Sequence, residues 1–292
     1  MKKGICFVLV CLILTAGCSQ QVFVTQPESP SYFADYTILL TGEGEGIKAD
    51  LSIKMAMTVT QNKENLYEGR IEAISLKSDS FPVAFDSKTS VSGSKLDVLP
   101  GQTLYFTIPE NGAAGMEVSG YDKIFERAGQ VEKGGDLLKE SQNMIFELFF
   151  SRDNFLSYLS FFSNADLEKK TEQDSSWEKQ IRVCNPVPYT ANAKFSYHGL
   201  TEGKHSVSME LPQANCSDFS VNRDNFSLTF SDITVSGSGK YIQNQGYTLV
   251  QSDAADQKMT GNLSVSIADG EVFSGPITLS VKTSFIVTEK KS

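Results

Sequence analysis

Apolar residues alternate with polar ones along much of the first 120 residues, which is the pattern of strands with one buried face. The clearest run covers residues 51–59, where Met55 and Met57 fall on the apolar side. Similar runs lie at 36–40, 67–76, 91–98 and 104–108. Glycine-rich or proline-containing turns separate several of them. We therefore expect residues 32–120 to form a first β lobe, an antiparallel meander of at least five strands.

Two changes of phase interrupt this alternation. The apolar positions change face between Ile71 and Ile74, and again between Phe230 and Ile233. An extra residue in one strand of a pair produces such a change, and the resulting bulge bends the sheet. The sequence thus predicts a curved sheet.

The apolar period changes from two to about 3.6 at Tyr121, which indicates helices over residues 121–165. A first helix should end before Gly134. Asp136 is a suitable N-cap for a second helix that reaches about Phe150. Ser151 or Asp153 should then begin a third.

Aromatic residues are concentrated in the last two of these helices, with seven between Phe146 and Phe162. Helices as apolar as these must be covered. They could form a solid plug packed on the inner face of a curved sheet, or a lid over an apolar cavity. A third interpretation is a helical hairpin that inserts into a membrane. The nearby charges of Glu147, Arg152 and Asp153 argue against it.

A second β lobe is expected over residues 177–289, beginning at Trp177. Its clearest hairpin joins 194–197 to 207–211, with Met209 on the apolar side, and the run 277–287 closes the chain. The predicted fold class is mainly β with a central helical insert (α+β). Two antiparallel lobes should form one domain over residues 32–292, a curved sheet or half-barrel around apolar helices.

The first residues form a leader with a lipobox. Two lysines precede a short apolar run, which ends in Leu14-Thr15-Ala16-Gly17-Cys18. This pattern is similar to bacterial lipoprotein signals, in which residues 1–17 are removed and Cys18 is acylated. Residues 18–31 then form a flexible tether, and the acyl chains anchor the protein to a membrane. By the same resemblance, Ser19 after the cysteine favours the outer membrane, on its periplasmic side or at the cell surface.

Two of the five cysteines leave with the leader and Cys18 carries lipid, so Cys184 and Cys216 remain. In an oxidising envelope such a pair predicts a disulfide. Closing a loop of about 32 residues would stabilise the fold by roughly 3 to 4 kcal/mol. Two free thiols or a metal pair is the rival reading, but the chain has no CxxC motif.

Charge and composition limit the classes of partner that the protein is expected to bind. The chain is 40% hydrophobic, which favours a true core, and its net charge of −9 becomes more negative once the leader lysines are lost. A negative charge without any basic run argues against nucleic acid as a partner. The remaining partners are the membrane, a lipid or acyl chain, and another envelope protein.

No catalytic or metal-binding motif is present, so we expect a protein that is not an enzyme and has no cofactor. The only two histidines, His198 and His205, flank a predicted hairpin loop and are not expected to bind metal. The 35 acidic residues leave open an enzyme built on a carboxylate pair, because only folding brings such pairs together.

Several short motifs resemble an uncharacterised family of bacterial envelope lipoproteins. They are Leu99-Pro100-Gly101-Gln102, the strand at Ile108, Asn111-Gly112, Val118-Ser119-Gly120 and the following Tyr121-Asp122-Lys123. The expected architecture in turn resembles that of the Lol-type lipoprotein carriers. This resemblance implies a curved antiparallel sheet around helices and an apolar cavity, although a fold does not by itself imply a function.

The leading functional hypothesis is that a hydrophobic or lipid-like ligand binds between the sheet and the aromatic helices. The residues expected to line this hydrophobic cavity are Met55, Met57, Leu148, Phe149, Phe155, Leu159, Phe162 and Met209. The alternative is a structural or protein-interaction lipoprotein with a solid core and no ligand.

Overall fold

The chain folds into one large antiparallel sheet of thirteen strands with three helices inserted. The computed structural model describes residues 31–63, 65–80, 83–89, 91–108, 116–132, 135–160, 175–184, 187–223, 226–245, 250–267 and 270–290. The expected leader, Cys18 and all of the tether except Ser31 lie outside these residues. From Ser31 onward the chain forms a single compact unit.

The strands of the first half precede the helices. They are β1 (Ser31–Gly44), β2 (Ile47–Lys63), β3 (Leu66–Lys77), β4 (Phe85–Asp86), β5 (Thr103–Thr107) and β6 (Val118–Ser119). The strands of the second half are β7 (Ser176–Cys184), β8 (Pro188–Thr201), β9 (Lys204–Asn215), β10 (Phe219–Arg223), β11 (Phe226–Asn244), β12 (Ser252–Ile267) and β13 (Gly270–Glu289).

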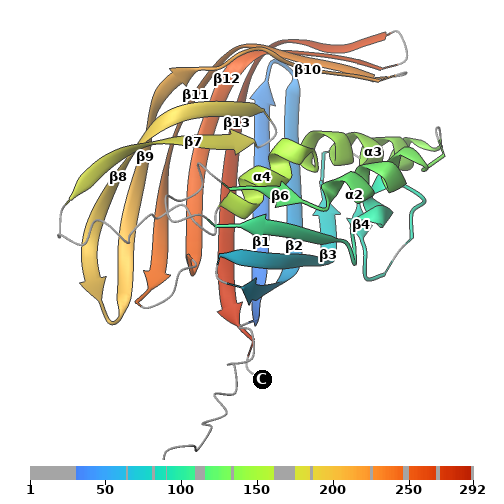
Figure 1. Ribbon diagram of the computed structural model, residues 1–292. Coiled ribbons are helices and arrows are strands. Elements are labelled where there is room, and N and C mark those ends of the chain that lie inside the picture. Colours follow the sequence, from blue (N-terminus) through green and yellow to red (C-terminus); the bar gives the residue numbers. More distant parts are fainter. Residues whose placement is uncertain are drawn as a thin grey trace, which may run out of the picture. The chain divides into compact units, whose positions relative to one another are not determined.

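The strand order is β6-β5-β3-β2-β1-β13-β12-β11-β9-β8-β7, with β4 beside β3 and β10 beside β11. The two halves are joined at the centre because β1 pairs with β13 from Tyr32–Glu289 to Gly44–Ile277. The expected curved sheet is confirmed (Figure 1). The open edges are formed by the short β6 and by β7, and short edge strands limit unwanted pairing with other chains.

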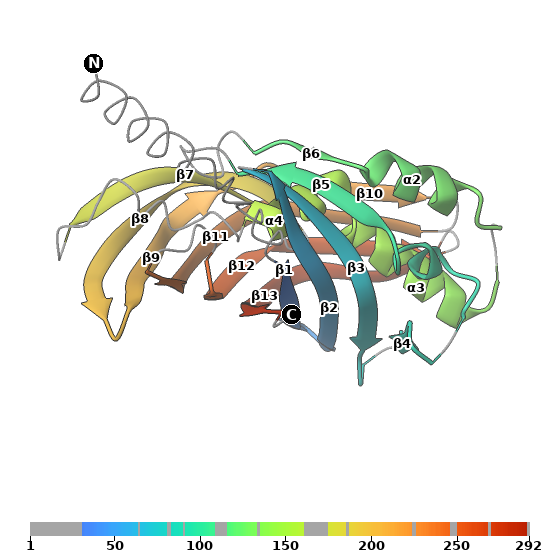
Figure 2. The same ribbon diagram turned by 60° about the horizontal axis from the view of Figure 1, so that its bottom comes forward.

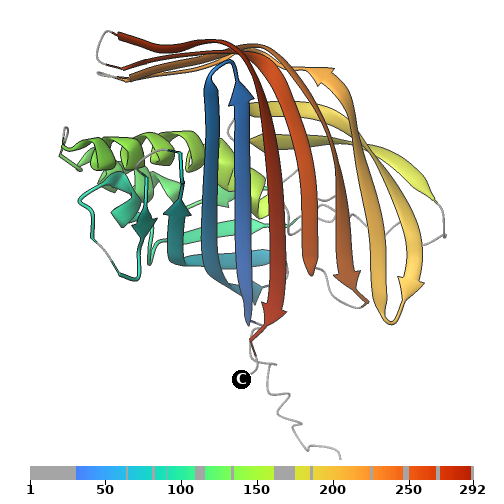
Figure 3. The ribbon, with the colours of Figure 1, turned by 180° about the vertical axis from the view of Figure 1, so that it is seen from behind.

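The helices α2 (Tyr121–Gly129), α3 (Leu137–Phe149) and α4 (Arg152–Ser160) lie on one face of the sheet, and the opposite face carries none of them (Figure 3). The Asp136 side chain accepts a hydrogen bond from the backbone N–H of Lys139 at 2.9 Å, so the expected N-cap is confirmed. Ser151 begins α4, since its hydroxyl accepts a hydrogen bond from the backbone N–H of Asn154.

Both predicted bulges are present. The β2–β3 register shifts where Ala56 and Met57 face Ala73 and Ile71, and the β11–β12 register shifts after Ser231. The strand expected at 91–98 is wrong, because residues Lys95–Val98 form a 3-10 helix, η1. Its cause is local: Ser94 caps the helix, and the Asp97 carboxylate accepts a hydrogen bond from the backbone N–H of Ser92. Such side-chain bonds to the backbone compete with strand pairing.

Candidate ligand-binding site

The buried apolar residues fall into two clusters, one in each half of the sheet. The first joins residues of β1, β2, β3 and β5 to the inner faces of all three helices. The second consists of residues from β7, β8, β9, β11, β12 and β13 and from two loop positions, and no described helix residue belongs to it. Figure 2 shows the helices beside the strands of the first half. The two halves therefore differ in what covers them.

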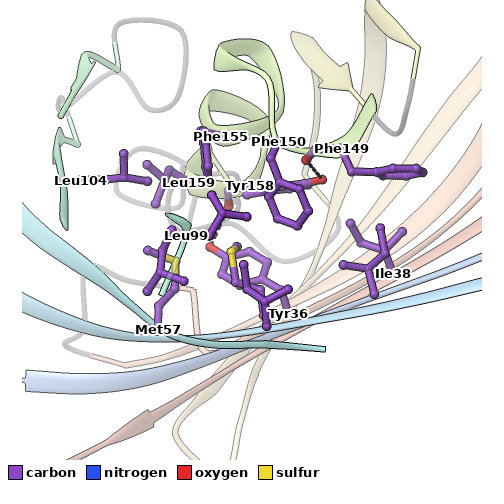
Figure 4. Packing of buried hydrophobic residues seen from close by; sticks show 14 of the residues in the cluster. Tyr36, Ile38, Met57, Leu99, Leu104, Phe149, Phe150, Phe155, Tyr158 and Leu159 are labelled. Carbon is purple, nitrogen blue, oxygen red and sulfur yellow. Dashed lines mark hydrogen bonds between the residues drawn. The ribbon is translucent and has the colours of Figure 1, made fainter. Parts of the chain in front are cut away.

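Six of the eight residues predicted to line a cavity meet in the first cluster: Met55, Met57, Leu148, Phe149, Phe155 and Leu159. Figure 4 shows the aromatic side chains of α3 and α4 directed toward Tyr36, Ile38 and Met57 of the sheet. Met209 does not join this group, because it belongs to the second cluster. Phe162 lies outside the described residues.

Among the described residues, the space between α3, α4 and the strands β1 and β2 is filled, whereas an open groove of about 570 Å³ lies between β5, β6 and the residues Tyr121, Arg152 and Leu156 of α2 and α4. Between the helices and β1 and β2, a cavity of about 10 Å³ remains, bounded by Tyr36, Ile38, Ile53, Met55, Phe150 and Tyr158. That volume holds about one water molecule. The Tyr36 hydroxyl donates to the backbone carbonyl of Tyr158 at 2.8 Å, and the Tyr158 hydroxyl donates to that of Phe149 at 2.7 Å. These bonds join α4 to both α3 and the sheet.

The concave face of the second half is lined by buried apolar residues of the strands. Trp177 and Phe195 stack across β7 and β8 with ring centroids 5.6 Å apart, and Phe195 also contacts the ring of Tyr241. The Tyr241 hydroxyl donates to the Met209 sulfur at 3.1 Å. Helix α4 reaches the edge of this surface, where it lies against β7.

A buried carboxyl group lies where the two clusters meet. Asp253 of β12 faces Tyr241 of the second cluster on one side and Phe285 of the first on the other. Burial raises the pKa of Asp253 well above its ordinary value. Burial first, and then the charge of Asp253, raises the pKa of the Tyr36 and Tyr241 hydroxyls. These pKa shifts favour the neutral form of all three groups.

Sequence reasoning missed Asp253 because β12 does not show the usual alternation. Its inward positions are Asp253, Ala255, Gln257 and Met259, a mixture of polar, small and apolar residues. The available signal was the unusual run of small or polar residues in a strand that must lie in the middle of a sheet.

The predicted disulfide between Cys184 and Cys216 stays a prediction. Cys216 is a free thiol in this structure, partly buried beside the second cluster, and burial raises its pKa. The backbone of Cys184 ends β7 opposite Pro188, but its side chain lies outside the described residues.

Other candidate chemistry is sparse in the part of the chain that the structure describes. No group of three or more His, Cys, Asp or Glu side chains there could hold a metal ion. The imidazole of His205 contacts the Tyr197 hydroxyl at 2.8 Å, and that of His198 contacts the Ser208 hydroxyl at 2.8 Å. None of the described helices has the length and apolar character needed to cross a bilayer.

An open groove of about 840 Å³ lies over β9, β11, β12 and β13. Its charged lining residues are Glu210, Asp256, Lys258 and Lys282, and Lys282 lies 3.7 Å from Asp256. These side chains are exposed. The groove therefore suits a polar partner and not an acyl chain.

Comparisons with known proteins give a fold likeness and no family. No protein-family model matches the chain, and no curated protein matches it in sequence. A structure solved for lipid–protein interactions in lipovitellin covers 91% of this chain at 10% identity, with a TM-score of 0.48. The chain spans 26% of that lipovitellin chain.

Two further solved structures have much lower TM-scores. The match to OpdO of Pseudomonas aeruginosa covers 90% of this chain and 98% of the OpdO chain, at 6% identity and a TM-score of 0.20. The match to OmpF of Salmonella typhi, solved in complex with daunomycin, covers 89% of this chain and 98% of the OmpF chain, at 8% identity and a TM-score of 0.20. Likenesses of this size carry no argument about what the chain binds.

Proposed function

We propose that this chain is a non-enzymatic lipoprotein, anchored by acyl chains on Cys18 to the outer membrane, that binds a hydrophobic or lipid-like ligand. The ligand lies on the concave face of the second half, beside α4. One observation carries the proposal: the second cluster consists of buried apolar residues, and no described helix residue belongs to it. Concave sites lined by apolar and aromatic side chains are the usual binding sites for apolar ligands.

The close packing of α3 and α4 on β1 and β2 supports this placement. Because the helices leave a cavity of only about 10 Å³ above β1 and β2, an acyl chain cannot enter there without displacing aromatic side chains. The aromatic helices thus serve as a plug for one half of the sheet, and the site belongs to the other half. This placement moves the ligand from the helix-covered residues Phe149 and Phe155 toward Met209.

Adjacent alanines on β12 allow a matched test. Ala255 is buried on the concave face, whereas Ala254 is exposed on the opposite face. Native mass spectrometry of Cys18→Ala protein as purified should detect a bound lipid mass. Delipidation should remove this mass. Ala255→Phe should abolish this mass by filling the face, while Ala254→Phe should retain it. Both variants must keep the circular dichroism spectrum of the parent.

The alternative function is a structural or interaction lipoprotein with no ligand. The open polar groove between Glu210 and Lys282 favours it, since a protein partner could bind there. A bare protein mass in every preparation would contradict lipid binding and leave this alternative.

The anchor requires its own test. Cys18→Ala protein should leave the membrane fraction and should not incorporate labelled palmitate, whereas Cys216→Ala should behave as the parent in both assays. Membrane association of Cys18→Ala together with palmitate incorporation would contradict the lipoprotein proposal.

A further inference from the structure

Three buried polar side chains on the concave face lack hydrogen-bond partners among the described residues. They are Asp253 and Gln257 of β12 and Thr283 of β13, and each is at most 6% exposed. The unpaired atoms are both carboxyl oxygens of Asp253, Oε1 of Gln257 and Oγ1 of Thr283. A buried polar atom without a partner typically costs about 1–3 kcal/mol of stability. Four such atoms close together therefore require an explanation.

The sheet register brings these groups together. Thr283 pairs with Ala255, which lies midway between Asp253 and Gln257 on β12. Thr283 is therefore the diagonal neighbour of both polar residues, and diagonal neighbours lie about 7–8 Å apart. All three side chains point to the same face, because their positions alternate in step with buried neighbours.

The surface next to this cluster is made of small residues. Ala255 faces Gly239 on β11, and Gln257 faces Gly237. The two glycines have no side chain on the concave face, and both remain partly accessible. The side chains of Gln257 and Met209 lie against these glycines, so that a Cβ atom at Gly237 or Gly239 would come within 3.2 Å of them.

Two hydroxyl groups near this cluster donate to other acceptors in the part of the chain that the structure describes. The Tyr36 hydroxyl is committed to the Tyr158 carbonyl, and the Tyr241 hydroxyl to the Met209 sulfur. Burial is the cause that raises the pKa of Asp253, and no described cation lowers it. Lys179 lies on β7, and β8, β9 and β11 separate it from β12 in the sheet order. Each of the four unpaired oxygens can accept a hydrogen bond, and two of them belong to the carboxyl group of Asp253.

We infer that Asp253, Gln257 and Thr283 form a subsite for the primary ammonium head of an amphipathic ligand, whose apolar part lies on the neighbouring aromatic surface. An ammonium group offers three N–H donors to the acceptor oxygens, and its positive charge would lower the pKa of Asp253, so that the carboxyl group releases its proton to solvent when the ligand binds. The net charge of −9 also attracts a cationic ligand. This inference deepens the proposed function and rests on it.

Single-chain amphiphiles with one tail and different heads test the inference. Dodecylamine, dodecyltrimethylammonium and dodecanol share a twelve-carbon chain, but only the amine offers a charged N–H donor. Isothermal titration of Cys18→Ala protein at pH 7, with each probe kept below micelle formation, measures the three affinities. Dodecylamine should bind about tenfold more tightly than either other probe, as expected for a charged hydrogen bond.

Two aspartates of β12 provide the variant and its control. Asp253→Asn should remove the preference for dodecylamine and leave the affinity for dodecanol unchanged. Asp256→Asn, on the exposed face of the same strand, should retain the preference. Thr283→Val removes one acceptor at nearly constant volume and should weaken dodecylamine about threefold or more, which gives a second reading if Asp253→Asn does not fold.

Each negative outcome has a distinct meaning. If no probe binds the parent protein, both the proposed function and the subsite are wrong. If dodecanol binds as tightly as dodecylamine, lipid binding stands and the ammonium subsite is wrong. The subsite is also wrong if a folded Asp253→Asn variant, or failing that Thr283→Val, keeps the full preference for the amine.

Discussion

The two halves of the sheet differ in what covers their concave faces. In the first half, aromatic side chains of α3 and α4 cover β1 and β2 and leave room for about one water molecule. In the second half, strand residues form the cluster themselves, and at its border Asp253, Gln257 and Thr283 have buried oxygens without a hydrogen bond among the described residues. Complete packing stabilises a fold, whereas unpaired polar groups weaken it, so the second half is where function is to be sought.

The largest expected effect tests whether the first half is solid. Phe155→Ala removes a side chain that is 1% exposed and packs against Phe150. The free energy of unfolding should fall by about 3–5 kcal/mol, as for other buried aromatic truncations. Chemical denaturation measures it, with Leu156→Ala, a half-buried neighbour on α4, as the milder control. A loss below about 1 kcal/mol would mean that the helices do not plug this half.

The predicted disulfide between Cys184 and Cys216 would join β7 to the end of β9 and so stabilise the second half, which has no described helix in its cluster. Non-reducing peptide mapping of oxidised protein should recover Cys184 linked to Cys216. Reduction should lower stability by roughly 3–4 kcal/mol, the entropic effect of opening a loop of about 32 residues. Two thiols that react with iodoacetamide in the oxidised, native protein would contradict the disulfide.

The hydrogen bond between Tyr36 and α4 joins the two layers of the first half. Tyr36→Phe leaves the Tyr158 carbonyl without its 2.8 Å donor, so stability should fall by about 1–3 kcal/mol. Thermal unfolding measures the change, and Tyr105→Phe, at an exposed position on β5, should have almost no effect. Equal melting temperatures for Tyr36→Phe and the parent would show that packing alone holds α4 in place.

The smallest expected effect concerns pH and Asp253 in the second half. Because burial raises its pKa, the native state holds a proton that the unfolded state loses near pH 4, so native stability falls as the pH rises above that value. Asp253→Asn does not titrate. Its melting temperature should match the parent near pH 4 and exceed it by a few degrees at pH 8.

Two groups that face Asp253, Tyr36 and Tyr241, do not interfere between pH 4 and 8, because their pKa values are raised well above the ordinary tyrosine value. Asp256→Asn is the control, since this exposed carboxyl should give no pH-dependent difference. A parallel pH profile for parent and Asp253→Asn would mean that Asp253 is ionised and paired in the native protein.

Local patterns predicted the elements well. Alternation identified β2 and β5, the phase changes identified both bulges, and Asp136 and Ser151 marked the starts of α3 and α4. These features depend on residues close in sequence, whose side chains set strand faces and helix caps directly. The failure at 91–98 has the same origin, because Ser94 and Asp97 formed local bonds that the apolar alternation did not reveal.

The sequence by itself determined that the chain is a curved antiparallel sheet with apolar helices, and that Leu148, Phe149, Phe155 and Leu159 of those helices are buried, although it did not show that Leu137 and Leu138 are exposed. Only the tertiary structure decided that β1 pairs with β13, which placed Met209 in a different cluster from Met55 and Met57. It alone brought Asp253, Gln257 and Thr283 together, with side-chain oxygens that have no hydrogen-bond partner in the described part of the chain. The physical reason is that strand order and register depend on contacts between distant segments, which no local periodicity encodes.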